Sequence, residues 1–328
     1  MQINRRRFTR LFGAVSALTV FSRDSLAQAY PSRPVRLVVP FPPGGAFDAV
    51  GRPWAEKIKP LLGTVTIENI GGGGSSLGAA AVTRAQADGY SLLLGGTQTH
   101  VNEALLKARP LYDPLKDLDP VTSVAFYFLG IAVHPSLPIQ NLAELIAYSK
   151  SNPGKLSYGH AGVGTIQHLT GELFKSATGT DIVQIPYRGT GPAISDLVAG
   201  QVPMGIVGVT GQVLELHAAG KMRVLAVTSP KRLVAAPEIP TASEQGQSRL
   251  TVTGTIGLLV PVGTPASIVK QISDATRTAL AEPTYQKMLI DTGMEAATDT
   301  GPEGLRRALA ADIALWSPVV KALELKLE

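Results

Sequence analysis

The sequence predicts an α/β protein built from parallel sheets in two domains. Short apolar, β-branched runs alternate along the chain with segments of helical periodicity, which is typical of parallel sheets covered by helices. Glycine-rich turns follow several of these strands, at the sheet edge where open α/β folds bind ligands. An N-terminal leader of 29 of the 328 residues leaves 299, which fits two domains of roughly 100–200 residues each.

Residues 1–29 have the features of an export signal. Four arginines within the first ten residues precede a modest apolar run, Leu11–Phe21, which is too short to span a bilayer. Small-x-small cleavage sites end at Ala27 and Ala29. The pattern Arg5-Arg6-x-Phe8 favours twin-arginine export over a general secretory leader that is rich in arginine. We therefore predict a periplasmic protein, cleaved near Ala27 or Ala29.

The charge and composition exclude several classes of protein. The leader holds five of the 30 basic residues and one of the 25 acidic residues, so the rest of the chain has a net charge of only +1. Such a chain offers no basic surface for nucleic acid. It has no cysteine for a disulfide or a metal site, and no segment after the leader is apolar enough for a membrane helix. We expect no cofactor, no metal and no nucleic-acid partner.

The first predicted strand is Val35–Val39, and the elements after it form the strongest candidate for a binding site. Three prolines end the strand, Gly44-Gly45 permits a tight turn, and a helix can begin at Ala46, with Phe47 and Trp54 on one face. The first turn of a helix has unpaired N–H groups and the positive end of the dipole. This order predicts an anion site, unless it is an ordinary connection between a strand and a helix.

The next two predicted strands, Val65–Glu68 and Ser91–Leu94, are also followed by glycines. The cluster Asn69–Ser76 leads to a helix of small residues, and Gly95-Gly96 leads to a helix that begins near Thr97. Glycine turns at three strand ends predict one ligand cleft at that edge of the sheet.

A long apolar run, Val121–Val133, is long enough to leave one domain and enter another. A second series of strands and helices follows, from Leu142 to Thr228, and the run Thr251–Val260 can return to the first domain. Helices complete the chain. We therefore assign residues 30–130 and 254–328 to a first lobe and residues 131–253 to a second.

The segment Gly162–Thr165 is a second anion candidate. Thr165 is a suitable N-cap, and Ile166, Leu169 and Leu173 lie on one face of the helix behind it. The alternative is a capped helix without a ligand.

A serine hydrolase is the alternative function. Gly74-Ser75-Ser76-Leu77-Gly78 matches the G-x-S-x-G nucleophile elbow, and histidines follow it in the chain. Four consecutive glycines explain this match by composition, however, and no H-G-G-G segment precedes it. We find neither a P-loop nor a G-x-G-x-x-G pattern, so no nucleotide site is expected.

Seven segments, in order along the chain, match one family pattern: Tyr30–Val35, Val39–Gly45, Asp88–Tyr90, Gly171–Phe174, Pro186–Gly189, Ala226–Arg232 and Trp316–Val320. With these segments the chain resembles the Bug (TctC-like) extracytoplasmic solute receptors of tripartite tricarboxylate transporters. The resemblance covers the whole chain after the leader and implies a type II periplasmic-binding-protein fold, two α/β lobes joined by two crossover strands with the ligand between them.

The resemblance also implies a ligand and partners. Receptors of this family bind mainly small carboxylates through backbone N–H groups and ordered waters, without an arginine clamp, and deliver them to transporter membrane subunits or to a sensor. We expect a monomer that is not an enzyme. The residues expected at the ligand are Phe41, Gly45, Ala46, Phe47, Asp48, Thr97, His100, His160, Gly162, Gly164, Thr165, Gly189 and Val209.

Three segments depart from the family pattern. Phe47 stands where threonine is common, the segment Met204–Val209 lacks the usual acidic residues, and Asn69–Gly74 replaces a usual Asn-Arg-Pro-Gly-Ala-Gly-Gly. An unpaired ammonium group is costly to bury. We therefore expect a ligand without an amine, either a dicarboxylate or an aromatic carboxylate whose apolar part lies against Phe47.

Overall fold

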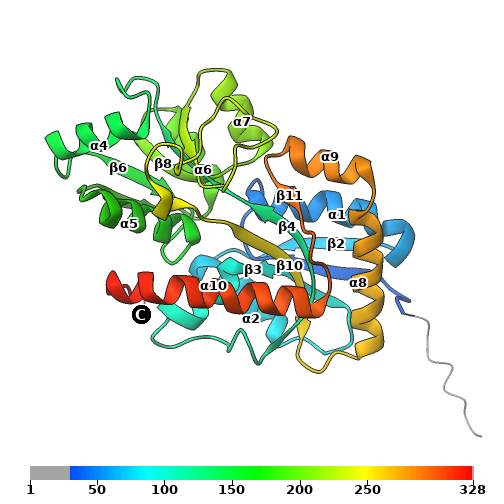
Figure 1. The fold of residues 1–328 in the computed structure, drawn as a ribbon. Helices are drawn as coiled ribbons and strands as arrows, with labels where there is room; N and C mark the ends of the chain where they lie inside the picture. The colour runs from blue at the N-terminus through cyan, green and yellow to red at the C-terminus, as the bar shows by residue number, and fades with distance from the viewer. Residues whose placement is uncertain (1–29, 327–328) are drawn as a thin grey trace, which may run out of the picture.

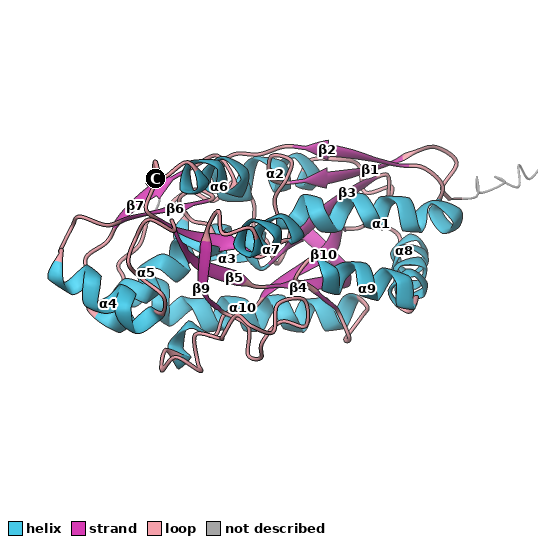
Figure 2. Cartoon of the chain, turned by 90° about the horizontal axis from the view of Figure 1, so that it is seen from above, coloured by secondary structure: helices cyan, strands magenta, loops and turns pink. Residues whose placement is uncertain are grey.

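The computed structural model describes residues 30–326, which form two sheets surrounded by helices (Figure 1). The predicted export signal lies outside these residues. Figure 2 shows an elongated molecule with one sheet toward each end. This is the mixed α/β architecture of two lobes that the sequence predicts.

The first sheet has six strands in the order β11-β4-β10-β3-β1-β2. We call the part of the molecule built on it the first lobe. Its parallel strands β1, β2 and β3 bring their carboxyl ends, and the glycine turns after them, to one edge. The strands are β1 (Val35–Val39), β2 (Val65–Asn69), β3 (Ser91–Gly96), β4 (Leu118–Tyr127), β10 (Gly254–Pro261) and β11 (Glu295–Ala296).

The second sheet has five strands in the order β7-β6-β8-β5-β9, and the part built on it is the second lobe. Its strands are β5 (Leu129–Val133), β6 (Ser157–His160), β7 (Val183–Pro186), β8 (Met204–Gly208) and β9 (Arg223–Val227). Four helices belong to it: α4 (Leu142–Ser151), α5 (Ile166–Thr178), α6 (Thr190–Val198) and α7 (Gly211–Ala218).

The remaining helices lie in the first lobe. The long helices α1, α8, α9 and α10 surround its sheet, and α2 and α3 follow the glycine turns (Figure 1). They are α1 (Ala46–Leu62), α2 (Ser76–Thr83), α3 (Thr97–Val101), α8 (Ala266–Leu280), α9 (Pro283–Asp291) and α10 (Pro302–Ala322), with short turns η1 (Gly73–Ser75), η2 (Asn102–Leu106) and, beside the second lobe, η3 (Ser248–Leu250).

The chain changes sheets at Phe128, between the end of β4 and the start of β5, and it returns at the start of β10. Strands β4 and β10 pair with each other over most of their lengths. Each sheet is mixed, which corrects the expectation of wholly parallel sheets: β10 runs antiparallel to β3, and β5 runs antiparallel to β8. The reason is that a strand arriving directly from the other lobe enters its sheet from the opposite end.

Packing in the core fixes the two helices whose N-termini face the cleft, α1 and α5. The buried face of α1 includes Val50, Trp54 and Ile58, and the Trp54 indole donates a hydrogen bond to Thr276 of α8 at 3.3 Å. In the second lobe, Leu169 and Leu173 bury one face of α5. Among residues 30–326, no helix combines the length and the apolar character that crossing a bilayer requires.

Candidate functional site

The turn between β1 and α1 presents backbone N–H groups. Gly44, with φ +91°, reverses the chain, and Gly45 stands at the N-cap in extended conformation without a side-chain cap. The first-turn N–H groups of α1, beginning at Ala46, therefore donate no hydrogen bond to a capping side chain. This is the arrangement that favours an anion.

Asp48 holds this turn in shape. Its carboxylate accepts hydrogen bonds from the Gly44 N–H at 3.1 Å, from the Arg52 guanidinium at 2.8 Å and from the Asn69 amide at 3.2 Å. Burial acts to raise the pKa of Asp48, but these hydrogen bonds outweigh it and leave the pKa below its usual value. The carboxylate is thus committed to its own turn.

The start of α5 is capped by its own threonine. The Thr165 hydroxyl accepts a hydrogen bond from the His168 N–H at 3.3 Å and donates to the Gly162 carbonyl at 2.6 Å. Gly162 and Gly164 both have positive φ, +131° and +83°, so the loop takes a path that other residues would adopt only with strain. One first-turn N–H, that of Ile166, points to the first lobe.

A small enclosed cavity lies against the start of α1. It has a volume of about 20 Å³, room for roughly one water molecule. On one side the rings of Phe41, Phe47 and Tyr127 pack together, with centroids 5.0 and 5.8 Å apart. We call it the inner cavity; its wall consists of Phe41, Pro42, Gly45, Ala46, Phe47, Gln98, Tyr127, Ala161, Gln167 and Thr190.

The polar side chains of the inner cavity are neutral. They are the amides of Gln98 and Gln167 and the hydroxyls of Tyr127 and Thr190, and no described residue on its wall carries a charged side chain. A carboxylate there would depend on backbone N–H groups, the dipole of α1 and neutral donors.

Gln98 joins the two lobes. Its amide nitrogen donates to the Gly164 carbonyl at 3.0 Å and to the Gly74 carbonyl at 3.2 Å, and its amide oxygen accepts from the Ile166 N–H at 2.6 Å. The side-chain oxygen of Gln98 therefore accepts the hydrogen bond that the first N–H group of α5 donates. In chemical terms it stands where a carboxylate oxygen would be held.

A wider cavity of about 730 Å³ adjoins the inner one and is walled by both lobes. The two cavities share Phe41, Pro42 and Ala161. The lobes approach closely at its rim, since a Cβ atom added at Gly74 would lie 2.8 Å from the Val163 carbonyl oxygen. We call this space the outer cavity.

Comparison with known proteins places this arrangement in a family. A model of the tripartite tricarboxylate transporter family receptor (TctC) matches residues 50–325. The chain belongs to this receptor family. It is also similar to the structure of the periplasmic binding protein BugD, with a TM-score of 0.86 and 34% identity over 91% of this chain and all of that one.

Two further similar structures contain carboxylates. MatC from Rhodopseudomonas palustris, solved with bound malate, has a TM-score of 0.84 and is 30% identical over 89% of this chain and all of MatC. A second R. palustris protein, solved with adipate, has a TM-score of 0.86 and is 32% identical over 90% of this chain and 99% of its own. The TctC family is one of periplasmic receptors, so the resemblance seen in the sequence is confirmed.

The TctC assignment excludes the hydrolase alternative, and the geometry at Ser76 agrees. The Ser76 hydroxyl lies between the Glu103 carboxylate and the Gly73 carbonyl, and it accepts a hydrogen bond from the Asn102 amide at 2.9 Å. Ser76 is 1% exposed. The hydroxyl is thus held within the first lobe, and its recorded partners do not include a histidine.

The structure brings about half of the predicted residues to the cavities. Phe41, Gly45, Ala46 and Phe47 line the inner cavity, and Gly162 and Gly189 line the outer one. Gly164 reaches the cleft through its carbonyl, which Gln98 contacts, while Thr165 caps α5 behind it.

The other predicted residues lie elsewhere. Thr97 contacts Asp312 of α10 and accepts from the Thr255 N–H at 2.7 Å, and Val209 is packed in the core of the second lobe. His100 is buried with its Nδ1 atom 3.0 Å from the Gly96 carbonyl, and burial lowers its pKa to about 4. These three side chains line neither cavity, and Asp48 faces a separate surface hollow.

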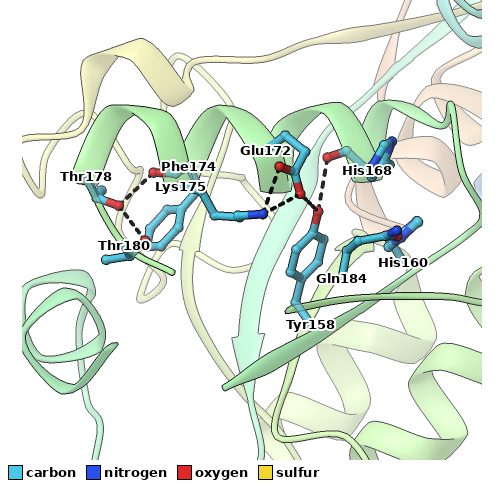
Figure 3. A network of polar contacts seen from close by, with 9 residues as sticks. All are labelled: Tyr158, His160, His168, Glu172, Phe174, Lys175, Thr178, Thr180 and Gln184. Carbon is cyan, nitrogen blue, oxygen red and sulfur yellow. Dashed lines mark hydrogen bonds and ion pairs between the residues drawn. The ribbon is translucent and has the colours of Figure 1, made fainter. Parts of the chain in front are cut away.

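His160 belongs to a polar network beneath α5 (Figure 3). Its Nε2 atom contacts Gln184 at 2.6 Å, and its ring stacks on that of His168 at 4.9 Å. The Tyr158 hydroxyl donates to Glu172 at 2.8 Å, and Glu172 pairs with Lys175. Burial lowers the pKa of both histidines, that of His168 to about 4, so both rings are neutral at neutral pH. This network therefore holds α5 against the second sheet.

Sequence reasoning missed Gln98, Tyr127, Gln167 and Thr190. Gln98 and Thr190 each fall in the first turn of a helix that follows a glycine turn, and this position could have marked them. Gln167, in the first turn of α5 after the turn Gly162–Gly164, carries the same signal, whereas Tyr127 does not.

Proposed function

We propose that this protein is a periplasmic receptor that captures a small organic carboxylate between its two lobes. The observation that carries the proposal is the uncapped start of α1, which opens on an enclosed cavity between the lobes. The malate and adipate found in two similar proteins support the same class of ligand. The receptor delivers its ligand to the membrane subunits of a tripartite tricarboxylate-type transporter or to a sensor, and it acts as a monomer.

In this proposal the first-turn N–H groups of α1 hold one acid group of the ligand. The helix dipole adds attraction for the negative charge, and Gln98, Gln167 and Thr190 supply neutral hydrogen bonds. An acid group at the start of α5 would replace the Gln98 oxygen at the Ile166 N–H. Ordered waters complete the hydrogen bonds where direct contacts are too long.

The ligand in this proposal has no ammonium group. An amine buried in the inner cavity would need an acceptor charge, and no described residue on that wall is acidic. Asp48 is committed to its turn and to Arg52, and Glu215 lies on neither cavity wall. The aromatic group of Phe41, Phe47 and Tyr127 favours a dicarboxylate or an aromatic carboxylate with an apolar portion.

A thermal-shift screen followed by calorimetry tests the proposal with matched pairs. Succinate is compared with aspartate, and phenylacetate with phenylalanine, at equal concentration and ionic strength. We expect the member without the amine to raise the melting temperature more in at least one pair. Stronger stabilisation by the amino acid in both pairs would contradict the ligand class, and no response to any carboxylate would contradict carboxylate binding.

We also propose that export uses the twin-arginine route, because of the Arg5-Arg6-x-Phe8 pattern. Replacing both arginines by lysine should then stop periplasmic accumulation in cells with both export routes intact. Undiminished accumulation would show that the general route suffices.

A further inference from the structure

The outer cavity has a different character from the inner one. It is far larger, about 730 against 20 Å³, and both lobes contribute to its wall. The first lobe supplies the glycines Gly71–Gly74 and Ser75, and the second lobe supplies Gly162-Val163 and the segment Pro186–Gly189. Since the cavities share three wall residues, a ligand longer than the inner cavity would extend into the outer one.

The charged side chains on the wall of the outer cavity are both cationic. They are Lys107 of the first lobe and Arg188 of the second, and no acidic residue among 30–326 lines this cavity. Neither cation forms a salt bridge or a side-chain hydrogen bond within the described part of the chain. The N-caps of α2 and α6, Ser75 and Gly189, lie on the same wall, so two helix dipoles add to the positive potential.

After its size and its charge, the third unusual feature of the outer cavity is Ser75 on its wall. It is the N-cap of α2 and has φ +98°, a left-handed conformation that strains a residue with a side chain. It is 1% exposed, and its hydroxyl has no hydrogen-bond partner within residues 30–326. This unpartnered hydroxyl is a hydrogen-bond donor that an anion bound at the cationic wall could satisfy.

We propose that the outer cavity is a second anion site, which holds the distal acid group of an elongated dicarboxylate. This rests on the proposed function, in which the first acid group binds at the start of α1. Lys107 and Arg188 belong to opposite lobes and line one cavity, so their like charges oppose closure of the lobes. An acid group between them turns this repulsion into attraction, and the ligand that reaches it brings the lobes together.

Calorimetry on a length series tests the proposal. Linear dicarboxylates from succinate to suberate are compared with the monocarboxylates of equal chain length. We expect affinity to rise at one length by at least tenfold over the monocarboxylate, to fall about tenfold in Lys107→Gln or Arg188→Gln, and to decrease with added salt. Lys155→Gln is the control, since Lys155 is an exposed lysine of the second lobe outside both cavities.

Ser75→Gly separates a binding role from a structural one. Glycine tolerates the positive φ, so this variant should melt at a higher temperature than the wild type while binding the long dicarboxylate more weakly. Equal affinity for di- and monocarboxylates, or unchanged affinity in both cation variants, would overturn the second site while carboxylate binding stands. If the wild type binds no carboxylate at all, it is the proposed function that fails.

Discussion

At the scale of single residues, the neutral wall of the inner cavity decides how an anion could be held. With two amides, two hydroxyls and two phenylalanine rings around it, the attraction for a negative charge has to come from the backbone N–H groups of α1. Backbone groups do not titrate near neutral pH, so binding should vary little with pH where the ligand stays ionised. Each such N–H can be removed by proline.

Ala46→Pro should weaken carboxylate binding by about 1.5–3 kcal/mol, the usual worth of a hydrogen bond to a charged group. Ala46 is the first residue of α1 and Gly45 before it is extended, so proline fits there and removes only the N–H. The control is Ala266→Pro, the same change at the first residue of α8, where Ala266 is exposed. Equal affinity of the two variants in calorimetry would contradict the role of this N–H.

Phe47→Thr should enlarge the inner cavity and change which acids bind. Phe47 is 4% exposed and packs on Phe41 and Tyr127, so its loss should destabilise the protein by about 3–5 kcal/mol. The new hydroxyl and space should favour hydroxylated acids such as malate over succinate, measured by calorimetry of both proteins. Phe47→Leu keeps the apolar wall and should keep the wild-type preference; a threonine variant with that same preference would contradict the prediction.

Individual side chains were the hardest part of the site to predict. An aspartate in the first turn of a helix can face a ligand or brace its own turn, and only the path of Gly44 and the position of Arg52 place Asp48 in the second role. His100 was expected near the cleft because it follows a glycine turn, but one position along a helix rotates a side chain by about 100°. The sequence pattern predicts the turn, but it does not predict the direction in which the His100 side chain points.

At the scale of elements, α10 is tied to both strands that run between the lobes. Its Asp312 contacts the Thr97 hydroxyl, and Thr97 in turn accepts from the N–H of Thr255 in β10. Burial raises the pKa of Asp312 from 3.8 to about 7. Burial, and secondarily the Asp312 carboxyl, raises the pKa of Tyr127 at the end of β4. The last helix of the chain thus places a titrating group beside the hinge.

Asp312→Asn should make the protein more stable above pH 7. In the folded protein Asp312 stays protonated up to about pH 7, whereas in the unfolded chain it ionises near pH 3.8. The unfolded state therefore binds fewer protons between these values, so this group's contribution to stability is present below pH 3.8 and is lost as pH rises through 7. Asparagine cannot ionise, so with the pKa of Asp312 raised from 3.8 to about 7 the gain at pH 8 should be about 4 kcal/mol.

Urea unfolding at a series of pH values measures this effect. The difference between variant and wild type isolates Asp312, because His100 and His168 act in the opposite direction in both proteins, losing stability as pH falls from 6.5 toward 4. Asp181→Asn serves as the exposed control. A difference that does not change from pH 4 to pH 8 would contradict the assignment.

Most elements were predictable because their signals are local. The second series of elements begins with α4 at Leu142, as predicted, and α5 begins directly after the predicted N-cap Thr165. The direction of β5 and β10 in their sheets was not predictable from periodicity, which is the same for a parallel and an antiparallel strand. Direction depends on which lobe the chain comes from.

At the scale of the whole molecule, several of the contacts between the lobes lie around the cavities. Gln98 provides three hydrogen bonds across or beside the cleft, and Gly74 and Val163 approach closely. The resemblance along the entire chain made two lobes predictable. The contacts of Gln98 and Gly74 with the other lobe were not predictable, because they depend on distances that a sequence does not contain. Closure of two lobes around a ligand is the motion expected of such a fold.

Gln98→Ala should shift the protein without ligand toward a more open form. Losing these hydrogen bonds should cost about 2 kcal/mol of interlobe contact, roughly a thirtyfold change in the ratio of closed to open molecules. Small-angle scattering should show a larger radius of gyration than the wild type. Gln167→Ala is the matched control, since Gln167 lines the same cavity but bonds Thr190 within its own lobe. Superimposable curves for all three proteins would contradict the prediction.

The place of β10 in the first sheet also governs the order in which the chain can fold as it is made. The second sheet comes from one continuous stretch, 129–227, and can assemble as soon as that stretch has left the ribosome. The first sheet has β10 between β3 and β4, so its centre stays open until residue 261 has been synthesised. Until then two strand edges are unpaired, and such edges invite aggregation. A chain that stops before Gly254 should therefore have a folded second lobe and an incomplete first lobe whose unpaired strand edges promote aggregation.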